Sequence, residues 1–438
     1  MAADKLTFSR GVHVREYKEL SENSSLFNAN MPKEVVIPLS QHIGAPSKAV
    51  VKKNDEVKVG QLIGQASGQF SANVHSSVSG VVKEIRNIQT ASGRNTQAVV
   101  IETDGLDEKI YGKETVDALS LSKEEIVEKM QQAGLVGMGG ATFPVHIKYS
   151  PAKPIDTVIV NGAECEPYVT CDDNLLRLKP LNIIKGLQLC MKAVDAKKGI
   201  IAIEDNKQNA IDIVTQKLKE SGIKDIEVNV LKTKYPQGDE KRIIDATLNR
   251  QVPSGGLPMD VGVNVSNVST VNAIYEACYL NKPLFERYIT ITGNAVKEPH
   301  NLLVRIGTSM RELIDQCGGF STKPGKIISG GPMMGITQQS IDTPVEKGTN
   351  CVLVLTEEEA KPPEINPCIR CGKCVSVCPV GLLPLYLAKN ATAERFDVCE
   401  QFNIKDCIEC GSCSYICPAK RPLVESIRFG KRELKKAK

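Results

Sequence analysis

The stretch from Cys368 to Pro418 carries one cysteine pattern twice. The first copy reads Cys368-Ile369-Arg370-Cys371-Gly372-Lys373-Cys374-Val375-Ser376-Val377-Cys378-Pro379, and the second reads Cys407-Ile408-Glu409-Cys410-Gly411-Ser412-Cys413-Ser414-Tyr415-Ile416-Cys417-Pro418. Each cysteine of the second copy lies 39 positions after its counterpart, so the stretch is an internal repeat. Three closely spaced thiolates hold three corners of a cubic iron–sulfur cluster, and the fourth, followed by proline, reaches across to the partner cluster.

This rule assigns the eight cysteines to two [4Fe–4S] clusters. One cluster takes Cys368, Cys371, Cys374 and Cys417, and the other takes Cys407, Cys410, Cys413 and Cys378. Gly372 and Gly411 can adopt positive φ, which turns backbone amides toward the cluster sulfurs. Structural zinc is the alternative, but zinc usually draws two cysteine pairs separated by a long gap. A two-cluster module carries single electrons, so the preceding residues must explain where the electrons come from.

The composition indicates a multidomain globular protein. A length of 438 residues predicts three or four domains, and 41% hydrophobic with 24% charged residues is ordinary for soluble proteins. No apolar run reaches the roughly 18 residues of a membrane span, and Met1–Arg10 lacks the apolar centre of a signal peptide. The cysteines outside the repeat are scattered, which favours a reducing cytoplasm.

The charge is small overall and uneven along the chain. The formal net charge is +4, yet residues 419–438 hold eight Lys or Arg and only two Glu. A basic tail of this kind is most often a solvated end. The alternative is that the tail docks on anionic lipid or on an acidic redox partner.

Residues 1–110 predict a barrel-sandwich hybrid domain. Alternating runs at Val35–Leu39, Asp55–Ile63 and Val78–Ile85, punctuated by glycines, are typical of short strands. The pattern looks like half of a lipoyl or biotinyl carrier domain, but the hairpin tip, His75–Ser79, has no lysine. We therefore expect a scaffold, in which the isolated His13, His42 and His75 have structural or surface roles.

Residues 111–280 predict an α/β domain with a candidate cofactor site. A helix begins at the N-cap Ser122, with Glu125 completing a capping box, and ends at Gly134. The glycine-rich loop Leu135–Pro144 follows, and its backbone can wrap a phosphate or a flat ring, with Lys148 as a cation for the same anion. The dinucleotide fingerprint does not fit, because a helix precedes the loop and Thr142 stands where the third glycine belongs.

The same domain alternates strands and helices, which implies a largely parallel sheet. The expected elements are a strand at Thr157–Val160, a helix at Leu178–Val194, a strand at Gly199–Ile203, a helix at Asn206–Ser221, a strand at Ile226–Leu231 and a helix starting near Lys241. Polar clusters stand at Asn161–Tyr168, Tyr235–Glu240 and Asn264–Thr270. Each polar run alone could simply form a turn. Three such runs after a glycine-rich loop favour a cofactor cleft.

The remaining residues predict a second β domain and the cluster module. Residues 281–356 are consistent with a β-grasp, SLBB-like domain, with strands at Tyr288–Gly293 and Lys326–Gly331 and a helix at Ser309–Cys317. Its role could be ligand binding or packing, and we favour packing. Residues 357–438 form the two-cluster, ferredoxin-like helical module with its basic tail, entered through a charged linker, Glu357–Asn366.

Four stretches resemble the NADH-oxidising flavoprotein subunit of respiratory complex I. They are Gly134–Lys148, Asn161–Tyr168, Tyr235–Glu240 and Ser266–Thr270. Together with Ile37–Pro46 and the cluster module, they make essentially the whole chain similar to the RnfC family of Rnf ion-translocating ferredoxin:NAD oxidoreductase complexes. The resemblance implies FMN, NAD(H) and two [4Fe–4S] clusters in a peripheral subunit at the cytoplasmic face of a bacterial cell membrane. It also implies partner subunits of a membrane-embedded redox complex that moves Na⁺ or H⁺, contact with ferredoxin only through them, and no nucleic acid.

The resemblance also implies roles for individual residues. The FMN phosphate would lie near Gly137, Gly139, Gly140 and Lys148. The flavin ring would be lined by Asn161, Glu164 and Cys165 and closed off by Asn267 and Thr270. The nicotinamide pocket would be shaped by Glu166, Tyr235 and Glu240, and cofactor would also be bound by Gly238 and Asp239. The sequence departs from the complex I pattern at Met138, where an arginine is common, and at Ala163, where an aspartate is common. No acid–base residue is required, because the cofactors supply the chemistry.

A flavin between NADH and the clusters would link a two-electron reaction to one-electron acceptors. Hydride transfer moves two electrons, each cluster accepts one, and a flavin can do both. We therefore expect NADH to reduce FMN and electrons to leave singly through the clusters to a partner subunit, or to flow in reverse. Two alternatives are a flavin-dependent cobalamin reductase of bacterial microcompartments and a non-catalytic electron relay whose flavin cleft has decayed. Met138 and Ala163 are the features that favour the relay.

Overall fold

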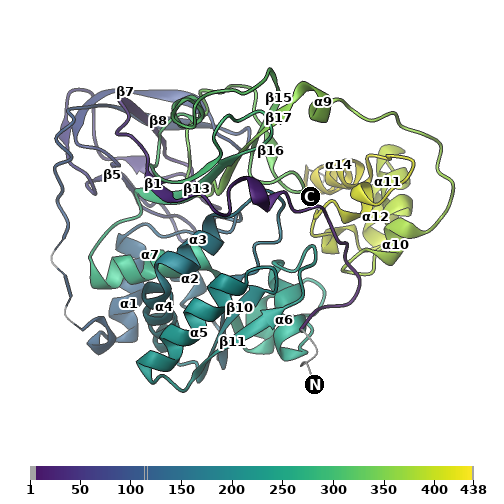
Figure 1. Cartoon of the computed structure of the whole chain (residues 1–438), viewed down its shortest axis with the longest axis horizontal. Coiled ribbons are helices and arrows are strands. Elements are labelled where there is room, and N and C mark those ends of the chain that lie inside the picture. Colours follow the sequence, from purple (N-terminus) through teal and green to yellow (C-terminus); the bar gives the residue numbers. More distant parts are fainter. Residues whose placement is uncertain (1–5, 113, 116, 437–438) are drawn as a thin grey trace.

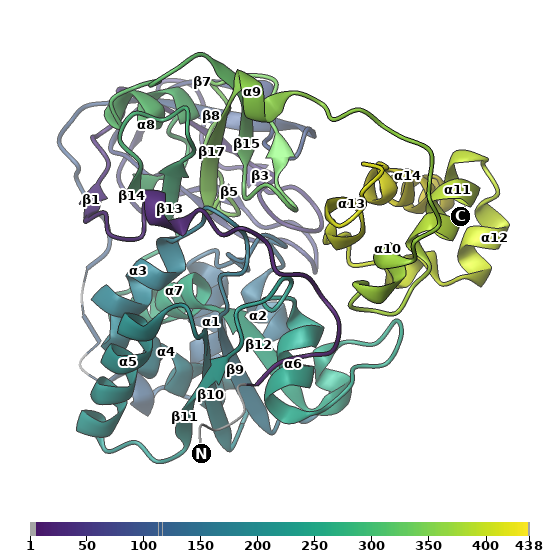
Figure 2. The same ribbon diagram turned by 45° about the vertical axis from the view of Figure 1, so that its right-hand side comes forward.

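The structure of the chain is a computed structural model that describes residues 6–112, 114–115 and 117–436. The start of the N-terminal stretch, residues 1–5, and the last two residues of the basic tail lie outside the described residues. Figures 1 and 2 show a body made of a barrel-like β part, an α/β part and a second β part, with a helical module at one side. The three body parts share one hydrophobic core, which runs from Val35 to Leu353, whereas the helical module has a core of its own.

The barrel-like part consists of two small antiparallel sheets, with the strand orders β2-β8-β7-β4 and β3-β5-β6. The strands are β2 (Glu34–Pro38), β3 (Lys48–Ala49), β4 (Glu56–Val57), β5 (Leu62–Gln65), β6 (Val74–His75), β7 (Gly80–Gln89) and β8 (Asn95–Thr103). The alternating run Asp55–Ile63 is divided between two short strands. Gly60 turns the chain with a φ of 84°, and β4 and β5 join different sheets on either side of it.

The α/β part is built on a parallel sheet of order β11-β10-β9-β12, which confirms the expected topology. Its strands are β9 (Thr157–Gly162), β10 (Lys198–Glu204), β11 (Ile226–Leu231) and β12 (Val263–Asn267), and its helices are α1 (Lys123–Gln132), α2 (Val145–Lys148), α3 (Cys171–Leu178), α4 (Pro180–Ala193), α5 (Gln208–Ser221), α6 (Glu240–Leu248) and α7 (Val268–Tyr279). Ser122 caps α1 as predicted, because its hydroxyl accepts from Glu125 N while the Glu125 carboxylate accepts from Ser122 N.

Two element boundaries in this part differ from expectation. The helix expected over Leu178–Val194 starts at Pro180, and Leu178 ends the preceding helix α3. Pro180 has no amide hydrogen to continue α3, and its fixed φ suits the first turn of α4, so the chain breaks at Lys179. The polar run Asn264–Thr270 is not a turn, because it spans the end of β12 and the start of α7.

The second β part is a mixed sheet with the order β1-β14-β13-β17-β15-β16. Its elements are β1 (Leu26–Asn28), β13 (Glu286–Thr292), β14 (His300–Arg305), α8 (Met310–Gln316), β15 (Pro324–Ser329), β16 (Ile336–Thr337), β17 (Cys351–Thr356) and α9 (Glu357–Ala360). Strand β1 comes from the N-terminal segment and pairs in parallel with β14. The residues expected to begin a linker at Glu357 are helical, since Thr356 and Glu359 form a capping box.

The C-terminal module is helical and follows a long connection without helix or strand after α9 (Figure 2). It contains α10 (Lys373–Ser376), α11 (Pro384–Thr392), α12 (Phe396–Gln401), α13 (Ser412–Tyr415) and α14 (Leu423–Lys436). A short 3₁₀ turn of the module is Ile404–Asp406, and those outside it are Lys18–Leu20, Ala118–Ser120 and Pro258–Val261. In the part of the chain that the structure describes, no helix is both long and apolar enough to cross a membrane.

Candidate functional site

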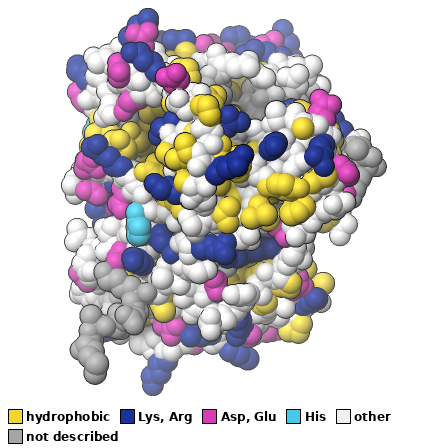
Figure 3. Space-filling view, turned by 90° about the vertical axis from the view of Figure 1, so that its right-hand side faces the viewer, with side chains coloured by type: hydrophobic (Ala, Val, Ile, Leu, Met, Phe, Trp, Pro, Cys, Tyr) yellow, Lys and Arg dark blue, Asp and Glu magenta, His cyan; other side chains and the backbone are white. Residues whose placement is uncertain are grey.

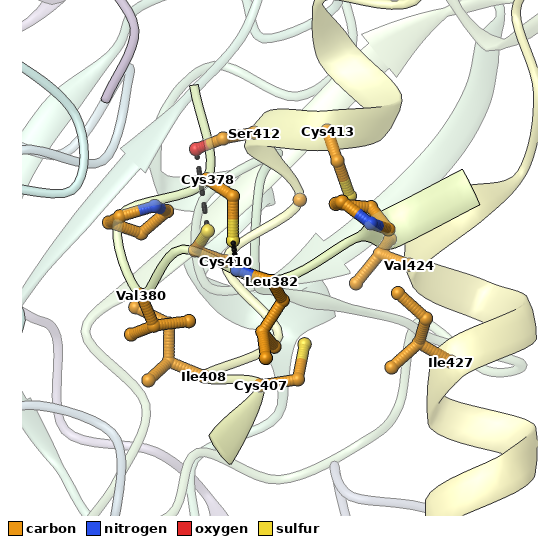
Figure 4. Close-up of a pocket in the computed structure, with 13 residues that line it drawn as sticks. Cys378, Val380, Leu382, Cys407, Ile408, Cys410, Ser412, Cys413, Val424 and Ile427 are labelled. Carbon is orange, nitrogen blue, oxygen red and sulfur yellow. Dashed lines mark hydrogen bonds between the residues drawn. The ribbon is translucent and has the colours of Figure 1, made fainter. Parts of the chain in front are cut away.

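The first candidate centre is a cavity in the C-terminal module lined by Cys378, Cys407, Cys410 and Cys413 (Figure 4). Three of these cysteines come from the second copy of the repeat, and Cys378 comes from the first. Apolar side chains complete the wall, among them Val380, Leu382, Val424 and Ile427. Backbone amides point at two of the sulfurs, with Leu382 N 3.3 Å from Cys378 Sγ and Glu409 N 3.4 Å from Cys407 Sγ. We call this set the inner cysteines.

A second cavity in the same module is lined by Cys368, Cys371, Cys374 and Cys417. This set, the outer cysteines, again combines three cysteines of one copy with the fourth of the other. Arg370 N donates to Cys368 Sγ at 3.4 Å, as Glu409 N does to Cys407 in the inner set. Cys368 and Cys371 are exposed, and Arg370, Lys373 and Arg421 also line the cavity. The outer site is therefore open to solvent and lies among cations.

Both cavities owe their shape to the same backbone turn. Gly372 and Gly411 have φ values of 74° and 78° and stand just before α10 and α13. A side chain would strain this left-handed conformation, which explains the glycine after the second cysteine of each copy. Among the described residues, no group of three or more His, Cys, Asp or Glu side chains is placed to hold a single metal ion. Four thiols around a cavity, with amide donors to their sulfurs, fit a four-iron cluster better than zinc.

The second candidate centre lies in the α/β part, where the parallel strands end. Asn161, near the carboxyl end of β9, donates through Nδ2 to Gly238 O at 2.8 Å and accepts from Ala163 N at 3.1 Å. Gly238 N in turn lies 3.3 Å from Cys165 Sγ. A Cβ on Gly238 would come within 2.4 Å of Ala163 O, so this close approach requires glycine. The structure thus brings Asn161, Cys165 and Gly238 together.

The glycine-rich loop meets this edge from the side of β12 and α7. Met138 N donates to Thr270 Oγ1 at 2.9 Å, and a Cβ on Gly139 would lie 3.3 Å from Asn267 Cβ. Asn267 caps α7 and donates through Nδ2 to Asp172 Oδ2 at 2.6 Å. Gly137 N donates to Phe143 O at 2.9 Å, and this hydrogen bond closes the loop. Gly140 adopts a φ of 109°, with open space where a Cβ would stand.

Lys148 and Glu240 form an ion pair at the same edge, with Nζ and Oε1 2.5 Å apart. Glu240 opens α6, and Asp239 caps this helix by accepting from the amides of Lys241 and Arg242 at 3.2 and 3.1 Å. The helix N-terminus is an electropositive position. An anion placed beside Lys148 would compete with the carboxylate of Glu240.

Tyr235 joins the α/β edge to the inner cysteines. Its side chain is 1% exposed, and its hydroxyl donates to Cys410 O at 2.8 Å and lies 3.4 Å from Glu166 Oε1. Glu166 Oε2 accepts from Met333 N, at 3.1 Å, in a loop of the second β part. A Cβ on Gly331 would collide with Glu166 Oε2 at 2.2 Å, so this glycine lets the loop approach. Three parts of the chain therefore meet at Glu166 and Tyr235.

The carboxyl groups of this edge are poorly solvated. Burial raises the pKa of Glu164 to about 7, with the nearby ammonium of Lys18 acting in the opposite direction. Burial likewise raises the pKa of Glu166 to about 7, partly offset by hydrogen bonds from the amides of Met333 and Met334. Glu164 Oε1 accepts from Asp172 N at 2.8 Å, while Oε2 is buried without a hydrogen-bond partner in the described structure. An orphaned oxygen of this kind calls for a ligand or a proton.

Lys18 is a residue of the site that sequence reasoning missed. Its ammonium is buried, with 3% of the residue exposed, and donates to the carbonyls of Glu164, Glu166 and Val169 at 2.7, 3.1 and 2.7 Å. Nothing in the N-terminal sequence marks this lysine. Met333 was also missed, although the glycines of Gly330–Gly335 were a usable signal.

Family comparisons cover each part of the chain. Residues 130–276 match the Nuo51 FMN-binding domain, and residues 6–106 match the RnfC barrel sandwich hybrid domain. Residues 288–337 match the SLBB domain, and residues 367–420 match the 4Fe-4S dicluster domain. These matches confirm the expected fold class of all four parts.

Relatives match the chain over nearly its full length. It is 48% identical over 436 residues to the C subunit of the Na⁺-translocating ferredoxin:NAD⁺ oxidoreductase complex of Acetobacterium woodii, covering 98% of this chain and 97% of that protein. The corresponding C subunit of the proton-translocating complex of Clostridium ljungdahlii is 46% identical, with 98% and 94% covered. The chain belongs to the RnfC family.

A further RnfC relative and one solved structure extend the comparison. The C subunit of the ion-translocating oxidoreductase complex of Rhodobacter capsulatus is 40% identical over 97% of this chain and 82% of that protein. The solved NAD⁺-reducing [NiFe]-hydrogenase in its H₂-reduced state aligns with a TM-score of 0.51 at 17% identity, covering 72% of this chain and 61% of that chain. The latter likeness concerns the fold alone.

Proposed function

We propose that this RnfC chain is the subunit that reacts with NAD(H) in a membrane-bound, ion-translocating ferredoxin:NAD oxidoreductase. It would exchange electrons between NAD(H), bound as substrate, FMN, two [4Fe–4S] clusters and partner subunits. The observation that carries the proposal is the Tyr235 hydroxyl, which belongs to the α/β edge and donates to the carbonyl of Cys410. A cofactor at that edge and a cluster on the inner cysteines would be separated by little more than this side chain.

The residues at the α/β edge fit FMN. The open side of Gly140 leaves room for a ligand, and the orphaned Glu164 Oε2 leaves an acceptor for one. In the proposal, the phosphate is held by Gly137, Gly139, Gly140 and Lys148. The flavin ring is surrounded by Asn161, Glu164, Cys165, Asn267 and Thr270, and its nicotinamide side is bordered by Glu166, Tyr235, Gly238, Asp239 and Glu240. When bound, FMN supplies the exchange between two-electron and one-electron transfer.

The order of the clusters follows from burial. The inner cysteines contact the α/β edge through Tyr235, and the outer cysteines include exposed Cys368 and Cys371. Next to them Ile369 is 70% exposed, and Arg370 and Lys373 are exposed as well. Figure 3 shows hydrophobic and basic side chains gathered on the face of the molecule that carries the module. Electrons would pass through the inner cluster to the outer one and from there to a partner subunit.

We place this subunit at the cytoplasmic face of a bacterial cell membrane, where it would contact ferredoxin only through other subunits. The basic tail contributes less free charge to such docking than its composition suggests. Lys431 and Arg428, both on α14, pair with Glu409, and Lys431 also donates to Cys407 O at 2.9 Å. Part of the tail is thus occupied in supporting the inner cysteines.

The test is to purify the chain anaerobically, reconstitute it with iron, sulfide and FMN, and record its absorbance on adding NADH. Bleaching of the flavin and cluster bands is the expected result. Bound FMN that does not bleach would count against the reaction with NADH. An absence of FMN binding would instead favour the relay without a flavin, and reduction of an added corrinoid would favour cobalamin reductase.

A further inference from the structure

The ligand loops of the inner cysteines contact both the α/β part and the N-terminal segment. Tyr235 donates to Cys410 O at 2.8 Å, and Gly11 N donates to Val377 O at 3.1 Å. A third contact comes from Arg242, whose Nη1 donates to Pro379 O at 2.8 Å. Pro379 directly follows Cys378, the cysteine that crosses from the first copy of the repeat into the inner set.

Arg242 is held in place by the turn that carries cofactor-binding residues. It lies in the first turn of α6, three positions after the N-cap Asp239, which accepts from the Arg242 amide. Its side chain is 14% exposed, and Nε lies 3.7 Å from Asp239 Oδ1. Nε is buried without a hydrogen-bond partner in the described structure. The guanidinium is therefore desolvated, only loosely paired with a carboxylate, and directed at the corner of the inner site.

A second arginine approaches the same corner from the N-terminal segment. Arg10 Nη1 lies 3.4 Å from Cys378 O, and a Cβ on Gly381 would stand 3.3 Å from the same nitrogen. Arg10 is exposed, so water and salt screen its charge. The two arginines thus provide one largely covered and one exposed guanidinium at one corner of the inner site.

We propose that Arg242 is a positioning residue that docks the Cys378–Pro379 corner onto the α/β part and raises the reduction potential of the inner cluster. The inference rests on the proposed assignment of Cys378, Cys407, Cys410 and Cys413 to one cluster. Reduction adds one electron to a cluster that its thiolates already make anionic, and a nearby permanent cation favours the more negative state. The inner cluster then becomes a better acceptor for electrons that arrive from the α/β edge.

The expected size follows from Coulomb's law. A unit charge within about 10 Å, at an effective dielectric constant of about 20, changes the reduced-to-oxidised ratio roughly tenfold. For a one-electron couple, tenfold corresponds to about 59 mV. Asp239 offsets part of the effect, so Arg242→Gln is expected to lower the inner midpoint potential by up to this amount. Arg10→Gln should lower it less, because that side chain is exposed.

The experiment is an EPR-monitored reductive titration of the reconstituted full chain with dithionite. Because NADH is not used, the result does not depend on whether the chain oxidises NADH. The Cys371→Ala variant lacks a ligand of the outer cluster, so its EPR signal identifies the inner cluster. The double variant Cys371→Ala/Arg242→Gln is then compared with Cys371→Ala alone. Arg421→Gln, in the chain with both clusters, is the matched control, because Arg421 lines the outer cavity and should shift only the outer signal.

Docking is measured separately by hydrogen–deuterium exchange of residues 375–382. Arg242→Gln should exchange faster there, and Arg242→Lys should keep most of the potential because it keeps the charge. An inner midpoint unchanged in Arg242→Gln, with full iron content, overturns the proposal whatever the exchange shows. Equal shifts of the inner midpoint potential in Arg242→Gln and Arg421→Gln would overturn the proposal too, since the effect would then not be specific to the Cys378–Pro379 corner.

Discussion

Replacing Lys18 by methionine should loosen the loop that follows β9. The ammonium donates to three main-chain carbonyls within residues 164–169 and is almost fully buried. Methionine keeps much of the length of the side chain and removes the donor. The carbonyls of Glu164, Glu166 and Val169 would then be buried without this partner.

The magnitude follows from the number and kind of bonds lost. A hydrogen bond to a charged group contributes about 1.5–3 kcal/mol, and the three bonds here share a single charge. Removing one partner from a buried charged network costs about 3–5 kcal/mol. At about 3 kcal/mol, the opening equilibrium of the loop rises on the order of 100-fold. The pKa of Glu164 should also rise further above about 7, because Lys18 now holds it down.

Hydrogen–deuterium exchange of a peptide spanning residues 161–172 measures this opening directly. Lys347→Met is the matched control, since Lys347 is another buried lysine that donates to carbonyls, those of Asn73 and Gly134, at 2.6 and 2.7 Å. It should accelerate exchange around Gly134 and leave residues 161–172 unchanged. If Lys18→Met changes exchange of residues 161–172 less than twofold, the ammonium does not hold the loop.

Four other substitutions test the cluster ligands, the phosphate site and a buried carboxyl group of strand β10. Cys410→Ala and Cys371→Ala should each remove one cluster and about half of the bound iron, and full iron content in either would refute the ligand sets. Lys148→Ala should weaken FMN binding on the order of tenfold, measured as flavin retained after gel filtration, because a charged hydrogen bond to the phosphate is lost; unchanged retention would remove Lys148 from the phosphate site. Burial raises the pKa of Glu204 to about 7 from 4.5, so its favourable contribution is present below pH 4.5 and lost as the pH rises through 7. Glu204→Gln should therefore be more stable than the parent at pH 8, by up to about 3 kcal/mol, and nearly equal to it at pH 4.5, with urea unfolding followed by circular dichroism as the measurement; a gap independent of pH would contradict this.

Local chemistry made much of the fold predictable. The capping box of Ser122 and Glu125, the alternation that produces the parallel sheet and the glycines beside the cysteines act over a few residues, so their signals survive in the sequence. The errors lie where tertiary context overrides local pattern. The two halves of the alternating run Asp55–Ile63 join different sheets on either side of Gly60, and Asn264–Thr270 is strand and helix, although its residues are typical of a turn.

By itself, then, the sequence determined the cysteine spacing of the two cluster sites, the glycine-rich loop and the polar residues at the ends of β9, β11 and β12. The tertiary structure alone decided how these pieces are joined. Lys18 reaches Glu164 across 146 positions, Arg242 reaches Pro379 across 137, and Tyr235 reaches Cys410 across 175. Contacts between residues so far apart leave no periodic trace in the chain, because they depend on how separately folded parts pack against one another rather than on the conformation of any short segment.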